Sequence, residues 1–236
     1  MQNQEASFHK EKEVSQETEQ KGKLPKKPKK EKFTWWQTLL ILFLTLGISI
    51  GAGYFISDKY FWSGFDQNQL KKQFEHYKNQ VDAQPNDPQH RVNLGYSYFL
   101  LGKNEEAIKQ FKVALDLDKN FYDAYLNLGI VYLDEERLDE GLKMATKASE
   151  IAPRDYKSQL LKGTAYRKLK MYDESLETLS KANELMPGNT DIITELGKVA
   201  EDQGDKKNAE ELFKEALNYD PLYKPALEGL DRVAAK

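Results

Sequence analysis

Apolar and charged residues are distributed unevenly along the chain, and an uncharged stretch near the N-terminus is the first contrast. No Asp, Glu, Lys or Arg occurs between Phe33 and Ser57, while both flanks are rich in charge. A helix rises about 1.5 Å per residue, so about 20 apolar residues cross the roughly 30 Å hydrocarbon core of a membrane. Aromatic residues lie at both ends of the stretch, as at membrane interfaces. The pattern predicts a transmembrane helix over residues 35–57.

Two other interpretations of this stretch are weighed against a single-pass signal-anchor. A buried helix of a water-exposed domain is disfavoured by the length, the aromatic ends and the lysine-rich flank. A cleaved signal peptide has an apolar region of about 7–15 residues that ends in a small-x-small site. Here the apolar region is longer, and the loose match to such a site lies around Gly51, Ala52 and Gly53.

Lysine asymmetry predicts the orientation of this helix. Residues 21–32 contain seven lysines and one glutamate, whereas the other flank has Lys59 and then Lys71 and Lys72. Lys/Arg-rich flanks stay in the cytoplasm, so we expect residues 1–34 to be a disordered cytoplasmic tail. The remaining chain is then extracytoplasmic, at the plasma or inner membrane of a bacterial cell. Contact of the basic run with anionic lipid is an alternative role for these lysines.

Beyond residue 87 the chain repeats itself with a period of 34 residues. Glycines, small residues, alanines and prolines each recur at this step, which is typical of a stacked helical array. Small residues are needed where two helices cross closely, and proline ends one unit and opens the next. The recurring positions are Gly95, Gly129, Gly163 and Gly197; Ala107, Gly141, Ser175 and Ala209; Ala114, Ala148, Ala182 and Ala216; and Pro153, Pro187 and Pro221.

This pattern resembles the tetratricopeptide repeat (TPR) family, in which Leu-Gly is followed by Tyr, a small residue, Phe, Ala and Pro. The first repeat reads Leu94-Gly95, Tyr98, Ala107, Phe111 and Ala114. Departures are Lys162 before the third glycine, and Ala145 and Leu179 in place of the aromatic of the second helix. The resemblance implies an all-α fold, a transmembrane helix followed by a right-handed α-solenoid of four repeats over residues 88–121, 122–155, 156–189 and 190–223.

Both ends of the repeat region are predicted to carry capping helices. Residues 58–87 are expected to form a juxtamembrane linker and a helix whose apolar stripe has the spacing i, i+4, i+7 and i+11, at Leu70, Phe74, Tyr77 and Val81. Residues 224–236 are expected to form a final helix with Leu227 and Leu230 facing inward. Polar caps of this kind close the open faces of a repeat array.

Composition and candidate chemistry give no indication of an enzyme. The net charge of −3 argues against a nucleic-acid partner, and the chain has no cysteine for thiol catalysis or zinc binding. The three histidines show no metal-ligand spacing. The acidic run 134–140 is read as a solvated turn in the second repeat, with a cation or a basic partner as the alternative. We therefore predict no catalytic residue, no metal, no cofactor and no small-molecule substrate.

In the TPR family the functional surface is the groove lined by the first helix of each repeat. We expect this groove to be apolar in repeats 1 and 2, basic in repeat 3 and mixed in charge in repeat 4. Asn93 and Asn127 occupy equivalent positions and either bind an extended peptide backbone or merely solvate the groove. The predicted peptide-binding residues are Val92, Asn93, Tyr96, Phe99, Leu126, Asn127, Ile130, Leu133, Lys157, Leu161, Thr164, Arg167, Lys168, Glu195 and Lys198.

The resemblance implies a protein-interaction scaffold or chaperone-like adaptor, with secretion or envelope assembly as the roles it suggests. Its partners would be a protein or peptide in the groove and membrane lipid around the anchor. An import-receptor-like protein with repeats facing the cytosol is the alternative, and the lysine-rich tail opposes it. Val92 and Tyr96 stand where relatives that bind the acidic C-terminus of cytosolic chaperones carry Lys and Asn, so that partner is not supported.

Overall fold

The computed structural model describes residues 36, 39–40, 43–44 and 63–235. The chain divides into two compact units, residues 1–61 and residues 62–236. The predicted tail over residues 1–34 and most of the predicted span over residues 35–57 lie outside the described residues. Among the residues that are described, no helix is both long enough and apolar enough to cross a membrane.

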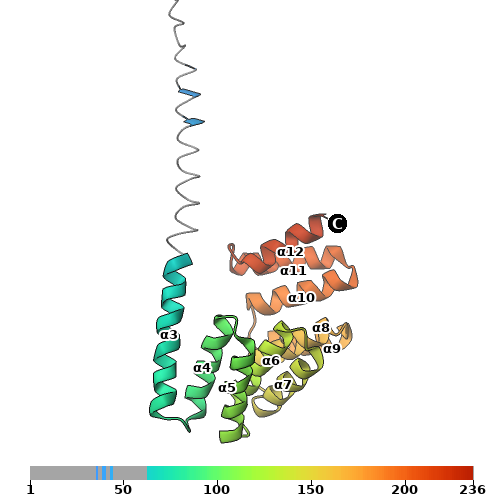
Figure 1. The fold of residues 1–236 in the computed structure, drawn as a ribbon. Coiled ribbons are helices and arrows are strands. Elements are labelled where there is room, and N and C mark those ends of the chain that lie inside the picture. Colours follow the sequence, from blue (N-terminus) through green and yellow to red (C-terminus); the bar gives the residue numbers. More distant parts are fainter. Residues whose placement is uncertain (1–35, 37–38, 41–42, 45–62, 236) are drawn as a thin grey trace, which may run out of the picture. The chain divides into compact units, whose positions relative to one another are not determined.

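All regular structure within residues 63–235 is helical (Figure 1). A long helix precedes four pairs of helices, and a single helix follows them. One pair lies within each of the ranges 88–121, 122–155, 156–189 and 190–223. The helices are α3 (Ser63–Ala83), α4 (Pro88–Leu100), α5 (Asn104–Leu117), α6 (Tyr122–Asp134), α7 (Leu138–Ile151), α8 (Tyr156–Lys168), α9 (Tyr172–Leu185), α10 (Thr190–Gln203), α11 (Lys206–Tyr219) and α12 (Lys224–Ala235).

Local sequence signals fix where several of these helices begin. The Asp87 carboxylate accepts hydrogen bonds from two backbone amides of the first turn of α4, and Pro88 occupies a position where its missing N–H costs nothing. Asn189 caps α10 in the same way, through the amide of Ile192. Because such caps satisfy amides that lack a partner inside the helix, they define the start of the first helix in these repeats.

The contacts between helices show which side of the array is concave. Each helix packs on the next, and the first helices α4, α6, α8, α10 and α12 also contact one another in succession. Within the described region, no two successive second helices, such as α5 and α7, have Cα atoms within 8 Å. The first helices therefore lie on the inner, concave side, and the second helices are spread along the outer side.

The two helices of a repeat meet closely at a glycine. A Cβ atom built on Gly95 would lie 2.6 Å from the Phe111 ring, and one on Gly197 would lie 2.7 Å from the Phe213 ring. Repeat 3 uses Leu179, which would lie 2.6 Å from a Cβ on Gly163. Any side chain at these glycines would push the helix axes apart. The 34-residue glycine spacing thus records one close crossing per repeat.

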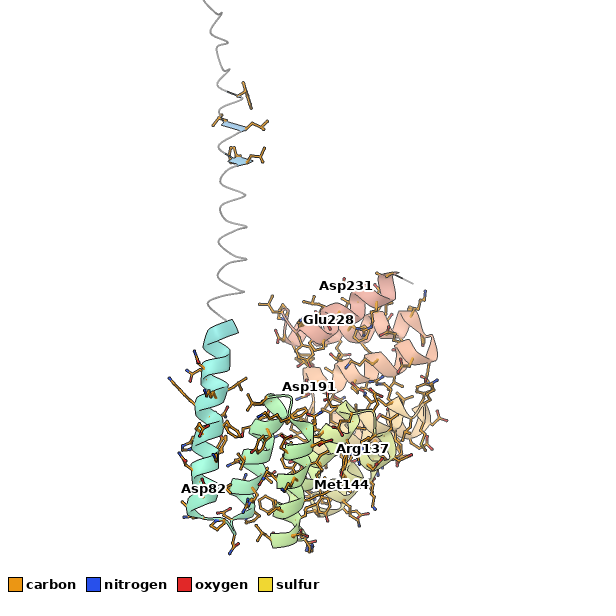
Figure 2. All side chains as sticks on the ribbon, in the orientation of Figure 1. Asp82, Arg137, Met144, Asp191, Glu228 and Asp231 are labelled. Atoms are coloured by element: carbon orange, nitrogen blue, oxygen red, sulfur yellow. The ribbon has the colours of Figure 1, made fainter. Side chains whose placement is uncertain are left out.

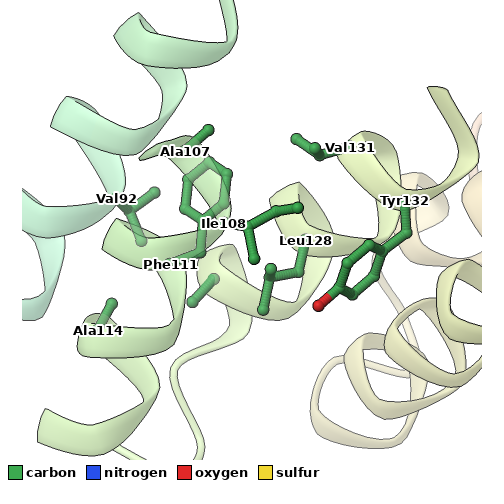
Figure 3. Close-up of a cluster of buried hydrophobic side chains, with 9 residues drawn as sticks. Val92, Ala107, Ile108, Phe111, Ala114, Leu128, Val131 and Tyr132 are labelled. Atoms are coloured by element: carbon green, nitrogen blue, oxygen red, sulfur yellow. The ribbon is translucent and has the colours of Figure 1, made fainter. Parts of the chain in front are cut away.

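Apolar side chains fill the space around these crossings and form two buried clusters. Between repeats 1 and 2 the fully buried Phe111 packs with Val92, Ile108, Leu128 and Val131 (Figure 3). A second cluster surrounds Phe213 in repeat 4 and extends into α12. Such packed apolar contacts, together with burial from water, supply most of the favourable free energy of folding.

Among the described residues, each end of the array is a single helix that is not paired within a repeat. At the N-terminal end the α3 stripe is buried or half-buried, and Phe74 packs edge-on against Tyr98 with ring centroids 4.9 Å apart. At the C-terminal end α12 occupies the place of a first helix. Glu228 and Asp231 lie on this helix (Figure 2).

The prediction that Leu227 faces inward is wrong. Leu227 is 40% exposed, whereas Ala226, Gly229 and Val233 are the buried residues of α12. The equivalent residue of repeat 4, Ile193, is buried in the cluster around Phe213 of the second helix α11. Among the described residues no second helix packs against α12 in this way, so Leu227 is in contact with solvent, while Leu230 is half-buried as expected.

We predict that Gly163→Leu destabilises the array by overpacking, on the order of 1–3 kcal/mol or more. A Cβ at residue 163 already meets Leu179 at a distance that real side chains do not tolerate. The control Gln159→Ala, on the same helix but at a half-buried position, should change stability by about 0.5 kcal/mol or less. Urea unfolding of the full chain, followed by circular dichroism, measures both. Equal losses in the two variants would contradict the glycine crossing.

Candidate peptide-binding groove

The concave face is formed by the first helices, and the structure distributes the fifteen predicted groove residues among three levels of exposure. Tyr96 and Lys157 are exposed. Three residues are buried, namely Val92, Leu133 and Glu195. The others are half-buried, with part of each side chain open to the surface: Asn93, Phe99, Leu126, Asn127, Ile130, Leu161, Thr164, Arg167, Lys168 and Lys198.

The apolar part of the groove is richest on α4. Tyr96 is 42% exposed, and its ring lies 6.4 Å from that of Phe99 at a tilted angle of 45°. Leu100 lies one helical turn after Tyr96, on the same face of α4, and Leu101 is the C-cap residue of this helix. Sequence reasoning missed both residues, and about two-fifths of each is exposed. We call Tyr96, Phe99, Leu100 and Leu101 the α4 strip. The sequence shows that Leu100 and Leu101 are apolar and lie close to Tyr96, but the groove positions taken from the TPR family do not include them.

Two predicted lining residues belong to the core and not to the groove surface. Val92 is 3% exposed and packs in the cluster around Phe111 (Figure 3). Leu133 is 4% exposed and covers Gly141 of the following helix. Leu133 fills the space beside Gly141, which has no side chain, and therefore packs beneath the groove surface. Neither side chain is accessible to a ligand in this conformation.

The two asparagines keep part of their hydrogen-bonding capacity free. The Asn93 side-chain oxygen accepts a bond from Gln89 Nε2 at 3.0 Å, and its NH₂ group has no partner among the described residues. The Asn127 NH₂ group donates to the Asp123 carbonyl at 2.7 Å, and its oxygen has no partner in that part of the chain. One amide thus offers donors and the other an acceptor, which matches the C=O and N–H groups of a peptide backbone.

The predicted basic surface in repeat 3 is largely neutralised, which corrects the expectation for that part of the groove. Arg167 Nε lies 2.6 Å from a Glu195 oxygen, and Arg167 Nη1 lies 2.8 Å from Asp202. Lys198 binds the other oxygen of Glu195 at 3.0 Å. Of the three cations predicted in repeat 3, namely Lys157, Arg167 and Lys168, only Lys157 has no ion-pair partner among the described residues. The two carboxylates that pair with Arg167 lie 28 and 35 residues away in sequence, so no local pattern indicated these two pairs.

Glu195 is the centre of this charge network. The residue is 5% exposed, and its two oxygens are shared between Arg167 and Lys198. Burial raises the pKa of the Glu195 carboxyl, but Lys198 and Arg167 outweigh burial and hold this pKa below its ordinary value. A buried carboxylate that lost these partners would destabilise the fold. Glu195 therefore connects α8 to α10 and is not a ligand-binding residue in this conformation.

Further ion pairs connect neighbouring repeats along the same half of the array. Arg232 of α12 lies 3.0 Å from Glu201 of α10. Lys168 of α8 lies 2.7 Å from Glu136, and also donates to the Leu133 carbonyl at 3.2 Å. The acidic run 134–140 is the turn between α6 and α7 together with the start of α7, in which Arg137 Nη2 pairs with Glu140 at 3.0 Å. The described residues contain no group of three or more His, Asp or Glu placed to hold a metal ion.

The architecture defines the chain as an all-α helical-repeat protein, and comparison with known families names the repeat. A family model described as TPR repeat matches residues 95–135. A second, described as tetratricopeptide repeat, matches residues 122–155, 156–189 and 190–221. The chain is therefore a solenoid of the tetratricopeptide type, as the sequence resemblance predicted. No curated protein sequence matches it.

Solved structures share this fold at low sequence identity. TTC0263, a thermophilic TPR protein in Thermus thermophilus, superposes with a TM-score of 0.62 at 19% identity, over 73% of this chain and 93% of the other. MamA (41-end) from Desulfovibrio magneticus RS-1 gives 0.57 at 22%, over 68% and 90%. YrrB, a TPR protein with an unusual peptide-binding site, gives 0.55 at 21%, over 70% and 86%. These likenesses establish the fold.

We predict that Glu195→Gln lowers the free energy of unfolding at pH 7 by about 2–4 kcal/mol, because it removes the buried carboxylate that pairs with Arg167 and Lys198. The wild-type carboxylate contributes stability that is present above its ordinary pKa of 4.5 and is lost as pH falls through its lower folded pKa. The gap between wild type and variant should therefore narrow below about pH 4.5.

Urea unfolding of the full chain between pH 7 and pH 3 measures this gap. Glu177→Gln is the control, since Glu177 is exposed and its ion pair is with Lys181 on the same helix. It should have little effect on stability. A gap for Glu195→Gln that stays constant down to pH 3 would contradict a lowered pKa.

Proposed function

We propose that this protein is a non-enzymatic scaffold or chaperone-like adaptor that binds an extended polypeptide segment in its concave groove. The observation that carries this proposal is the α4 strip, an exposed aromatic and aliphatic surface beside the half-free amide of Asn93. Water-exposed apolar surface of this kind on a concave face marks an interaction site. Arrays of the tetratricopeptide type serve as protein-interaction scaffolds, and this chain has that architecture.

The geometry favours an extended ligand that is apolar where it meets repeats 1 and 2. Apolar ligand side chains pack against Tyr96 and Phe99 and remove both surfaces from water. The Asn93 NH₂ group donates to a ligand carbonyl, and the Asn127 oxygen accepts from a ligand N–H. A backbone bound in this way leaves alternate side chains free for recognition. YrrB, which has a similar fold, is a TPR protein with an unusual peptide-binding site, and this likeness supports the proposal that the array binds a peptide.

The sequence supports placing this scaffold at a membrane. In this proposal residues 35–57 are a single-pass anchor, the lysine-rich tail stays in the cytoplasm, and the repeats act outside the plasma or inner membrane of a bacterial cell. Support comes from the uncharged 35–57 stretch and the seven lysines of residues 21–32. A scaffold in this location would assist polypeptides during secretion or envelope assembly.

Protease accessibility tests the topology. In intact cells stripped of wall or outer membrane, added protease should remove the repeats, because the lysine-rich flank keeps the N-terminus inside. Immunoblotting with an antibody to the repeat region follows the loss, and a cytoplasmic protein is the control that must stay intact. Repeats that are protected until the membrane is lysed would support the cytosol-facing alternative instead.

Photo-crosslinking in whole cells tests the groove. A photo-reactive phenylalanine at Tyr96 should crosslink a polypeptide partner, whereas one at the exposed Lys112, on the second helix of the same repeat, should not. The variant Asn93→Ala/Asn127→Ala should reduce the Tyr96 crosslink several-fold without loss of helicity by circular dichroism. Crosslinks of equal yield and identity at residues 96 and 112, or unchanged yield in the double variant, would place binding elsewhere.

A further inference from the structure

An open cleft with several charged residues lies where the turns of repeats 2, 3 and 4 approach one another. It has a volume of about 490 Å³ and is lined by Glu136, Arg167, Lys168, Lys170, Tyr172 and Asp202. These residues come from the α6–α7 turn, the end of α8, the α8–α9 turn, the start of α9 and the end of α10. The cleft thus lies at the end of the first helices, beside the concave face.

Cations outnumber anions in this cleft by three to two. Lys168 pairs with Glu136, and Arg167 pairs with Asp202. Lys170 has no ion-pair partner among the described residues, so one positive charge of the lining is uncompensated. Glu136 and Lys170 occupy equivalent turn positions with φ of 57° and 61°, where repeats 1 and 4 have Gly102 and Gly204. Repeats 2 and 3 therefore place charged residues at turns that a glycine would suit better.

The three carboxylates that contact Arg167 and Lys168 differ in how firmly they are held. Glu195 is buried and shared by two cations, so it is a fixed part of the fold. The side chain of Glu136 is 70% exposed and that of Asp202 is 37% exposed. The cations are more enclosed, with 26% of the Lys168 side chain and 15% of the Arg167 side chain exposed, so solvent competes mainly for the two carboxylates. Glu136 and Asp202 are therefore displaceable, whereas Glu195 is not.

We propose that this cleft binds two neighbouring carboxylates of an acidic polypeptide segment, and that Glu136 and Asp202 occupy its cations in the absence of that segment. The inference rests on the proposed function, since the acidic segment would belong to the polypeptide bound in the groove. A ligand with two carboxylates reaches Arg167, Lys168 and Lys170 together, whereas Glu136 and Asp202 neutralise one cation each. Charge-assisted hydrogen bonds to several donors favour the ligand in this exchange.

This arrangement makes the protein selective among acidic segments. A single carboxylate gains little from replacing one internal acid, so binding requires a ligand that also engages the unpaired Lys170. Competition by Glu136 and Asp202 lowers the affinity for a ligand with two carboxylates, because that ligand must displace both internal acids. Removing either internal acid should therefore tighten binding, which is the opposite of what loss of a contact residue does.

The test measures binding of acetyl-tetraglutamate-amide to the full chain in mild detergent by calorimetry at low ionic strength. Glu136→Gln and Asp202→Asn should each lower the Kd about 2–5-fold, as expected for release of an exposed pair. Glu140→Gln and Glu177→Gln are matched controls, because they remove the same charge from exposed ion pairs outside the cleft. These controls should change the Kd by less than about 2-fold. Lys168→Gln and Lys170→Gln should raise it about tenfold.

Four outcomes would overturn the proposal. They are no binding of tetraglutamate by any of these proteins, weaker binding in the Glu136 and Asp202 variants, equal tightening in the controls, or unchanged binding in the lysine variants. Tyr96→Ala separates this proposal from the groove, because it should leave tetraglutamate binding intact. If the Tyr96 crosslink is found but the cleft does not bind tetraglutamate, the proposed function stands and the cleft proposal is wrong. If the cleft binds tetraglutamate but the Tyr96 crosslink is not found, only the proposal of peptide binding in the groove is wrong.

Discussion

The close approach of two helices at a glycine is the constraint on which the rest of the array depends. At Gly95, Gly163 and Gly197 the absence of a Cβ lets a ring or a leucine of the partner helix occupy the space directly above the backbone. Repeat 2 departs from this scheme, because Ala145 is too small to fill the space above Gly129. There Leu161, from the next repeat, comes within 2.8 Å of a Cβ built on Gly129, and Leu133 covers Gly141. The helix crossing is preserved while its filling residue changes.

The curvature and the groove follow from this crossing. Because the first helices contact one another and the second helices do not, the surface that the first helices present is concave. The same geometry determines which positions of a first helix reach that surface. Val92 is turned into the core, while Tyr96, one helical turn further on, is exposed at the concave side. The concave surface is thus the part of each first helix that remains exposed after it has packed against its neighbours.

The periodic features of the fold could be predicted from the sequence, because the same residue pattern recurs in each repeat. The 34-residue step located every helix pair, and the apolar spacing from Leu70 to Val81 located α3. Details that depend on neighbours in space could not be predicted. Leu227 is exposed because no second helix packs on α12 among the described residues. Arg167 is not a free cation because it pairs with Glu195, which is 28 residues away in sequence. The predicted span over residues 35–57 is not tested by the described residues.

Neighbouring repeats are joined by different forces in the two halves of the array. Between repeats 1 and 2 the contact is an apolar cluster around Phe111, which leaves aromatic and aliphatic side chains on the concave surface above it. Between repeats 3 and 4, and on to α12, ion pairs through Arg167, Glu195 and Arg232 accompany the apolar core. One end of the concave face therefore presents exposed apolar side chains, whereas the cations at the other end are already paired with carboxylates. The exposure of each carboxylate determines how readily its ion pair opens, and burial separates Asp202 from Glu195 in this respect.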